Sequence, residues 1–143
     1  MEMSEFIQQQ IQKLVNIHET RNPFLIAKEK DILILKEDLG EVYGYYNKIN
    51  RIKMIHLNNL FSDERQLFTC AHELCHALIH QDENTPQLSK QTIVSEWKVE
   101  KEANYFATQL LIDGSHLEHY IDTTDKIINF YGLPEEMKKY IRE

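Results

Sequence analysis

Residues that interrupt or cross-link a fold are scarce in this sequence. Its 143 residues include four glycines, three prolines and two cysteines. So little glycine and proline, with 42% hydrophobic residues, excludes a low-complexity or linker-rich chain and favours a folded globular protein. Cys70 and Cys75 fall in one predicted helix, where a disulfide between them is geometrically awkward. We therefore expect two buried free thiols in a reducing compartment, the cytoplasm.

Long apolar runs and an excess of basic residues are also lacking. No run approaches the roughly 20 residues that a membrane-spanning helix needs, and residues 1–13 lack the basic start and apolar centre of a signal peptide. Lys and Arg number 16 against 23 Asp and Glu, which gives a net charge of −7. Such a chain is a poor partner for nucleic-acid phosphates, which bind clustered Lys and Arg. We expect no membrane and no direct nucleic-acid partner.

The length and the order of the patterned segments predict one α+β domain spanning residues 1–143. Apolar residues at helical spacing predict a helix from Ser4 to about Thr20. Three short runs rich in β-branched and aromatic residues follow this helix. They predict a small, mainly antiparallel sheet with strands at 32–35, 42–46 and 52–57.

Two long helices are predicted after the sheet. Ser62 is a suitable N-cap for the first, which runs to about His80. A polar loop follows, and Ser95 is expected to cap the second long helix, which ends before Gly114.

Short helices are predicted for the tail at residues 115–143. Ser115 and Glu118 form a capping-box pattern, and Thr124 begins a further helical segment. The tail offers few basic residues for phosphates, so we expect it to serve in packing or partner docking and not in DNA binding.

Residues 72–76 form the HExxH pattern. On a helix His72 and His76 lie one above the other, roughly 6 Å apart along the axis, and both imidazoles can reach one ion at about 2.1 Å. Glu73 lies about 100° round the helix, where it can contact a zinc-activated water without being a ligand. Zinc lowers the pKa of such a water towards about 7, so Glu73 is the predicted general base.

The same helix gathers its polar side chains on one line. His72, His76, His80 and Thr69 form a stripe about 80° wide beside a broad apolar side. Burying three histidines without a partner would be costly. This arrangement favours a zinc site over a hydrogen-bonded structural cluster.

A catalytic zinc site needs a third protein ligand and keeps one position open. His80 rises about 12 Å from His72, whereas two ligands of one zinc lie at most about 4 Å apart, so His80 is excluded. The longer HExxHxxGxxH pattern is absent, since Ile79 and Asp82 replace its glycine and third histidine. Cys75 points to the packed side of the helix. The third ligand is therefore expected on the second long helix.

Glu100 is the predicted third ligand. The apolar stripe of the second helix centres near Ala103, and Glu100 lies about 60° from that centre, inside the buried face. A carboxylate in an apolar face requires a partner, and a metal cation supplies one. Asn104, one turn on, could hold a histidine or the ligand carboxylate in place. Glu102 lies about 100° from the centre, at the edge of the face, and we expect it to be solvated.

These residues resemble the ImmA/IrrE family of metallo-endopeptidases. Family members typically show F-T-x-A-H-E-x-x-H-x-x-x-H and then E-x-E-A-N-x-F-A-x-x-L-L, and both patterns stand here almost entire. The similarity covers most of the chain, from the first predicted strand to the second long helix. Two departures are Cys75, where glycine is usual, and Ile112-Asp113, where Met-Pro is common. Neither departure removes a ligand.

The resemblance implies a zincin-like fold with zinc bound by His72, His76 and Glu100, and Glu73 as general base. It also implies a biological role. Such proteins, often encoded by phages and integrative elements, cleave a partner repressor with a helix-turn-helix domain in the bacterial cytoplasm and so release its promoters.

Two alternatives to a zinc endopeptidase stay open. One is a non-cleaving antirepressor that binds its target, although binding alone requires no general base such as Glu73. The other is a purely structural zinc, whose removal should unfold the domain. The oxyanion-stabilising donor is also open between residues such as Tyr105 and His80. We expect His80, like Asn104, to support the metal site from outside the ligand set, bonded to a loop carbonyl or the sheet.

Overall fold

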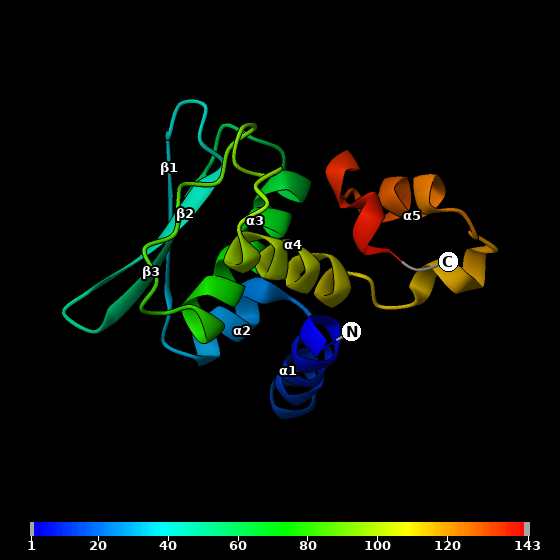
Figure 1. Cartoon of the computed structure of the whole chain (residues 1–143), viewed down its shortest axis with the longest axis horizontal. Helices are drawn as coiled ribbons and strands as arrows, with labels where there is room; N and C mark the ends of the chain where they lie inside the picture. The colour runs from blue at the N-terminus through cyan, green and yellow to red at the C-terminus, as the bar shows by residue number, and fades with distance from the viewer. Residues whose placement is uncertain (1, 142–143) are drawn as a thin grey trace.

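The structure, a computed structural model, describes residues 2–141 (Figure 1). In this part of the chain, no helix is both long enough and apolar enough to cross a membrane. The elements in chain order are α1 (Glu2–His18), α2 (Pro23–Glu29), β1 (Leu33–Glu37), β2 (Gly44–Ile49), β3 (Ile52–Asn58), α3 (Asp63–Ile79), α4 (Lys98–Leu111), the 3₁₀ helix η1 (Ser115–His119), α5 (Thr124–Tyr131) and the 3₁₀ helix η2 (Glu135–Tyr140).

The predicted α+β fold with a small sheet is confirmed. The sheet has the strand order β1-β3-β2. The β2–β3 pair is an antiparallel hairpin, whereas β1 pairs with β3 in parallel, with Leu33 opposite Met54. The chain leaves one strand position free between β1 and β2, and β3 returns into it, so β3 runs parallel to β1 and antiparallel to β2.

The helix α2 is not among the elements predicted from the sequence. Asn22 is in fact the N-cap of α2, and its side chain accepts a hydrogen bond from the Phe24 backbone at 2.9 Å. Pro23 occupies the first helical position, where its missing N–H costs nothing. An Asn-Pro pair can therefore begin a helix as well as end one.

The predicted N-cap of α3 is confirmed, because the Ser62 hydroxyl accepts a hydrogen bond from the backbone N–H of Arg65. The prediction for Ser95 is wrong. The N-cap of α4 is Trp97, and the Ser95 hydroxyl accepts from the Trp97 backbone at 3.2 Å, before the helix begins. The capping box at Ser115 is also wrong, because Gly114 is the N-cap of η1 and no side chain caps it.

Helix α3 lies at the centre of the molecule. It packs against β2 and β3 on one side, against α2, and along most of its length against α4 (Figure 1). In the C-terminal segment η2 packs on α4 and α5 packs on η2, and the Met137 side chain of η2 is fully buried. The largest fully buried side chains are Phe68, Phe106, Ile7, Ile11, Ile26, Ile55, Leu57, Leu74, Leu88, Ile93, Leu110 and Met137.

Gly44 allows the sheet to approach α3 closely. A Cβ atom at this position would lie 2.4 Å from the carbonyl oxygen of His56 and 2.7 Å from Cγ2 of Thr69. Thr69 lies one turn before Glu73 on α3. The glycine therefore fixes the separation of the sheet from the HExxH helix.

Replacing Gly44 with alanine should lower the free energy of unfolding by about 1–3 kcal/mol, because the added methyl group would overpack this contact. Urea denaturation measures the change. The exposed Ile49, on the same strand, supplies the control, and Ile49→Ala should change stability by less than about 1 kcal/mol. Equal stability of Gly44→Ala and the unchanged protein would show that the contact relaxes freely.

Candidate metal centre

Four ionisable side chains meet where α3 packs on α4. His72, Glu73 and His76 come from α3 and Glu100 from the first turn of α4, and all four are fully buried. Small residues on α4, Ala103 among them, let the two helices approach at this level. The residues predicted as ligands and base are thus brought together in one buried cluster.

The Glu100 carboxylate contacts both histidine rings. Its Oε1 lies 3.2 Å from Nε2 of His72, and its Oε2 lies 2.8 Å from Nε2 of His76. The two rings stand nearly perpendicular, with centroids 4.9 Å apart. One carboxylate therefore faces the outer nitrogen of each imidazole.

The contact between His76 and Glu100 is short but is not a hydrogen bond. Nε2 of His76 and Oε2 of Glu100 are both buried atoms without a hydrogen-bond partner among the described residues. Their geometry does not suit a hydrogen bond between them, so each atom can offer a lone pair to a metal ion. Two imidazole nitrogens and one carboxylate form the ligand set of catalytic zinc sites, so these residues fit a metal ion.

Glu73 completes the cluster as a buried carboxylate without a partner. Its donor atoms lie within 4.8 Å of those of His72 and His76. Neither of its oxygens has a hydrogen-bond partner among the described residues. Burial raises the pKa of Glu73 to about 8. A carboxyl group with a pKa near neutrality is suited to accept and return a proton.

The charges of the cluster favour a cation beside Glu100. Burial opposes ionisation of Glu100, but the two histidine rings that face its carboxylate outweigh this effect and hold the pKa of Glu100 at about 2. Burial lowers the pKa of His76 to about 4. For His72 the effect of burial is overcome by the Glu100 and Glu73 carboxylates, which raise its pKa. The carboxylate thus stays ionised in a buried site and attracts positive charge.

The profile of a peptidase family described as the IrrE N-terminal-like domain matches residues 27–140. This span includes both long helices and all four residues of the cluster. The chain belongs to this family. The resemblance drawn from the sequence is confirmed. Membership of a peptidase family and a His–Glu–His cluster that could hold a metal ion identify the IrrE-like chain as a metallopeptidase.

Two proteins are similar to this chain over nearly its whole length. The "Uncharacterized immunity region protein 2" of Bacillus phage phi105 is 34% identical over 131 residues, which cover 89% of this chain and 83% of the phage protein. The "Metallopeptidase ImmA" of Bacillus subtilis (strain 168) is 29% identical over 144 residues, which cover 96% and 84% of the two chains.

Asn104 lies behind His72 in the IrrE-like chain. Its Oδ1 is 2.9 Å from Nδ1 of His72, and its Nδ2 donates to the carbonyl of Ile93 at 2.9 Å. The amide is nearly fully buried. Held by the loop before α4, it can accept from Nδ1 and so leave Nε2 of His72 free to bind an ion.

His80 and Glu102 differ from the expectations. Nδ1 of His80 lies 2.9 Å from Nδ1 of His76, and its Nε2 lies 2.8 Å from Oε1 of Glu102. His80 therefore bonds neither a loop carbonyl nor the sheet through its ring. Glu102, expected to be solvated, is only 9% exposed, because the edge of the α4 face meets the end of α3. The sequence contained one signal for this contact: His80 lies one turn after His76, and a histidine buried there requires a hydrogen-bond partner.

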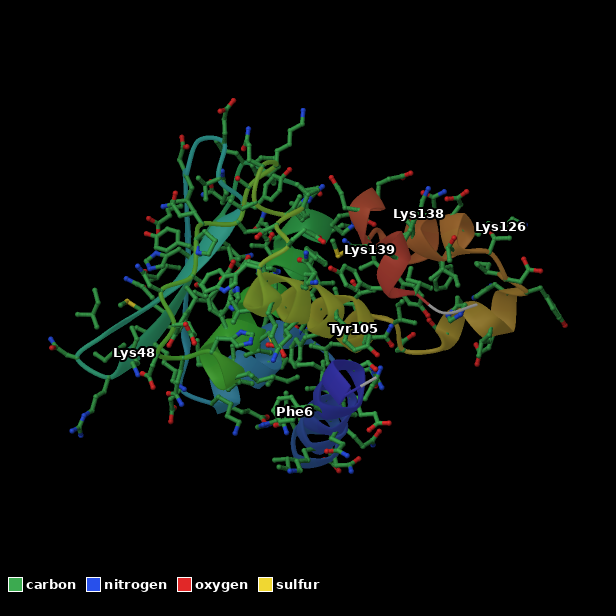
Figure 2. All side chains as sticks on the ribbon, in the orientation of Figure 1. Phe6, Lys48, Tyr105, Lys126, Lys138 and Lys139 are labelled. Atoms are coloured by element: carbon green, nitrogen blue, oxygen red, sulfur yellow. The ribbon has the colours of Figure 1, made fainter. Side chains whose placement is uncertain are left out.

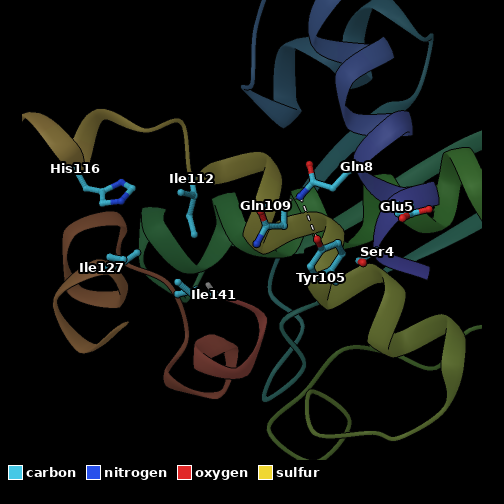
Figure 3. Close-up of a pocket in the computed structure, with 9 residues that line it drawn as sticks. All are labelled: Ser4, Glu5, Gln8, Tyr105, Gln109, Ile112, His116, Ile127 and Ile141. Carbon is cyan, nitrogen blue, oxygen red and sulfur yellow. Dashed lines mark hydrogen bonds between the residues drawn. The ribbon is translucent and has the colours of Figure 1, made fainter. Parts of the chain in front are cut away.

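Neither residue considered for the oxyanion has a free donor directed at the cluster. Both ring nitrogens of His80 are engaged. The phenol of Tyr105 faces α1 and accepts a hydrogen bond from Gln8 at 3.1 Å (Figures 2 and 3). It lines a cavity of about 390 Å³ that includes none of the four cluster residues. The cysteines are free and buried, as predicted.

Proposed function

We propose that the chain is a zinc endopeptidase in which His72, His76 and Glu100 bind the metal and Glu73 is the general base. The observation that carries this proposal is the contact of one buried Glu100 carboxylate with Nε2 of both histidines. Glu73 differs from Glu100 in this respect, because neither of its oxygens forms a hydrogen bond with a histidine ring.

Bound zinc would act as a Lewis acid that lowers the pKa of water and polarises the scissile carbonyl. The protein residues supply the rest of the chemistry. Glu73 accepts a proton from the attacking water and returns it to the leaving amine. Asn104 holds His72 in the tautomer whose Nε2 carries a lone pair.

We further propose that the substrate is a partner helix-turn-helix repressor, whose cleavage relieves repression in the bacterial cytoplasm. The support is similarity to a phage protein named for an immunity region and to a protein named as a metallopeptidase. The whole chain, residues 1–143, would act as one peptidase domain, with residues from 115 on as its helical tail.

Direct DNA binding by the tail is disfavoured because Lys138 and Lys139, both labelled in Figure 2, are paired with carboxylates. Lys138 forms ion pairs with Asp125 and Glu135, and Lys139 lies 3.5 Å from Glu96. Lysines neutralised by carboxylates offer little to phosphates. The tail instead packs on α4.

A non-cleaving antirepressor is the second candidate. The observation that favours it is the complete burial of His72, Glu73, His76 and Glu100, since a peptide must reach these groups to be cut. In that case zinc would stabilise a binding module.

If the reading frame beside this chain encodes a helix-turn-helix repressor, co-expression of the two proteins tests the proposal. Reporter expression should rise while an immunoblot shows the repressor in two fragments. The two purified proteins should give the same cleavage, which a chelator should stop and added zinc should restore. Full reporter relief with an intact repressor would instead establish the antirepressor, and no effect on reporter or repressor would reject this substrate.

A further inference from the structure

A chain of hydrogen-bonding side chains leads away from the cluster on the side of His76. The Nδ1 atoms of His76 and His80 lie 2.9 Å apart, and Nε2 of His80 lies 2.8 Å from Oε1 of Glu102. His76 is fully buried, and His80 and Glu102 are 6% and 9% exposed. The three residues therefore form a protected line from the cluster to the edge of the α3–α4 interface.

The protons along this line have one consistent arrangement. If Nε2 of His76 donates its lone pair to a cation, its Nδ1 carries the hydrogen. Nδ1 of His80 must then accept, which leaves the hydrogen of His80 on Nε2, directed at the Glu102 carboxylate. Each contact thus has one donor and one acceptor, and the negative charge stands at the far end.

The contacts on the two histidines of HExxH are unequal. His72 is held by the neutral amide of Asn104, itself anchored on a loop carbonyl. His76 is held by a second imidazole that ends at a carboxylate. A carboxylate acting through hydrogen bonds makes the ligand nitrogen a stronger donor and fixes the ring orientation.

We propose that Glu102, acting through His80, is a positioning residue for His76 as a metal ligand. His80 transmits the hydrogen bond, and Glu102 fixes the tautomer of both rings. This inference rests on the proposed metal site and deepens it, because it assigns a function to a histidine too far from His72 to be a ligand and to a glutamate outside the proposed ligand set.

A double-mutant cycle on zinc affinity tests the inference. In His80→Asn the amide oxygen can still accept from His76 but cannot reach Glu102, and Glu102→Gln removes the terminal charge. Each change should weaken zinc binding by about 10–100-fold. Because Glu102 acts only through His80, adding Glu102→Gln to His80→Asn should cause little further loss. Chelator competition after full equilibration measures the dissociation constants.

Two further measurements separate positioning from a general loss of stability. The visible spectrum of the Co²⁺-loaded protein should change in Glu102→Gln, since the His76 ring is less firmly held. Glu102→Asp, which keeps the charge, should recover most of the affinity. Glu37→Gln is the matched control, because Glu37 contacts Nδ1 of His56 at 3.0 Å on the sheet. It should leave zinc affinity unchanged.

The outcomes distinguish this inference from the proposed function. If the unsubstituted protein fails to bind one zinc, the metal site itself is wrong. If it binds zinc but Glu102→Gln and His80→Asn bind equally well, or if their effects multiply in the double variant, the positioning role is overturned. Should Glu102→Gln fail to fold, His80→Asn and Glu102→Asp decide, and unchanged affinity in His80→Asn rejects the inference.

Discussion

Replacing Glu73 with glutamine should leave zinc bound and reduce cleavage of the repressor by about 10²–10⁴-fold, the usual contribution of a general base. Glutamine keeps the shape of the side chain but cannot take a proton from water. The loss should therefore fall on kcat, with zinc content unchanged. Single-turnover cleavage by the purified protein and metal analysis measure the two quantities.

The same substitution should stabilise the metal-free protein at alkaline pH. The pKa of Glu73 is about 8 in the folded protein against an ordinary value of 4.5, so the folded state holds a proton that the unfolded state releases. Stability therefore falls as the pH rises from about 4.5 to 8. Glu73→Gln should be more stable than the unchanged chelated protein by about 1–3 kcal/mol at pH 8 and close to it at pH 4.

Urea denaturation at the two pH values gives this comparison. Gain of stability with loss of cleavage would mark Glu73 as a group kept for chemistry at a cost in folding. Full cleavage by Glu73→Gln would reject the general-base role. Full relief of repression by Glu73→Gln with the repressor intact would favour the antirepressor instead.

Replacing Glu100 with glutamine should weaken zinc binding by more than about 100-fold. This loss is larger than that expected from removing a residue that only hydrogen-bonds to a metal ligand. The neutral amide keeps the volume but removes the charge that both histidine rings face. Cleavage should be lost with the metal at ordinary zinc concentrations and should return in part when zinc is raised. Metal analysis and cleavage over a zinc titration measure the effect.

Glu96→Gln is the matched control for this change. Glu96 lies just before α4, and its carboxylate is 76% exposed and 3.5 Å from Lys139. Removing its charge should leave zinc binding unchanged, because exposed ion pairs contribute little. If Glu100→Gln bound zinc as tightly as the control, Glu100 would not be the third ligand, and Glu73 would be the remaining carboxylate of the cluster.

The sequence indicated which residues would meet because the helical period sets where each one lies on its own helix. The i, i+4 spacing places His72 and His76 together whatever the rest of the chain does. The apolar stripe of α4 then identifies Glu100 as a position on the buried face of that helix and not on its solvent-facing side. These inferences needed only the helical period and the cost of burying a charge.

Features that depend on how elements meet were not predictable in this way. Whether the edge of the α4 face meets solvent or the end of α3 depends on the packing angle of two helices, and this decides the surroundings of Glu102. The parallel pairing of β1 depends on the path of a loop. The start of α4 at Lys98, and not after Ser95, depends on contacts of the preceding loop that no cap signal records.

The complete burial of the cluster has a kinetic consequence. A chelator, like a peptide substrate, can reach a metal ion held by these unexposed side chains only after part of the surrounding structure moves. Release of the metal must wait for this local opening, an event governed by the stability of the elements packed on α3. Metal exchange should therefore proceed at a rate that stops rising with chelator concentration, and that limiting rate reports how often this opening occurs.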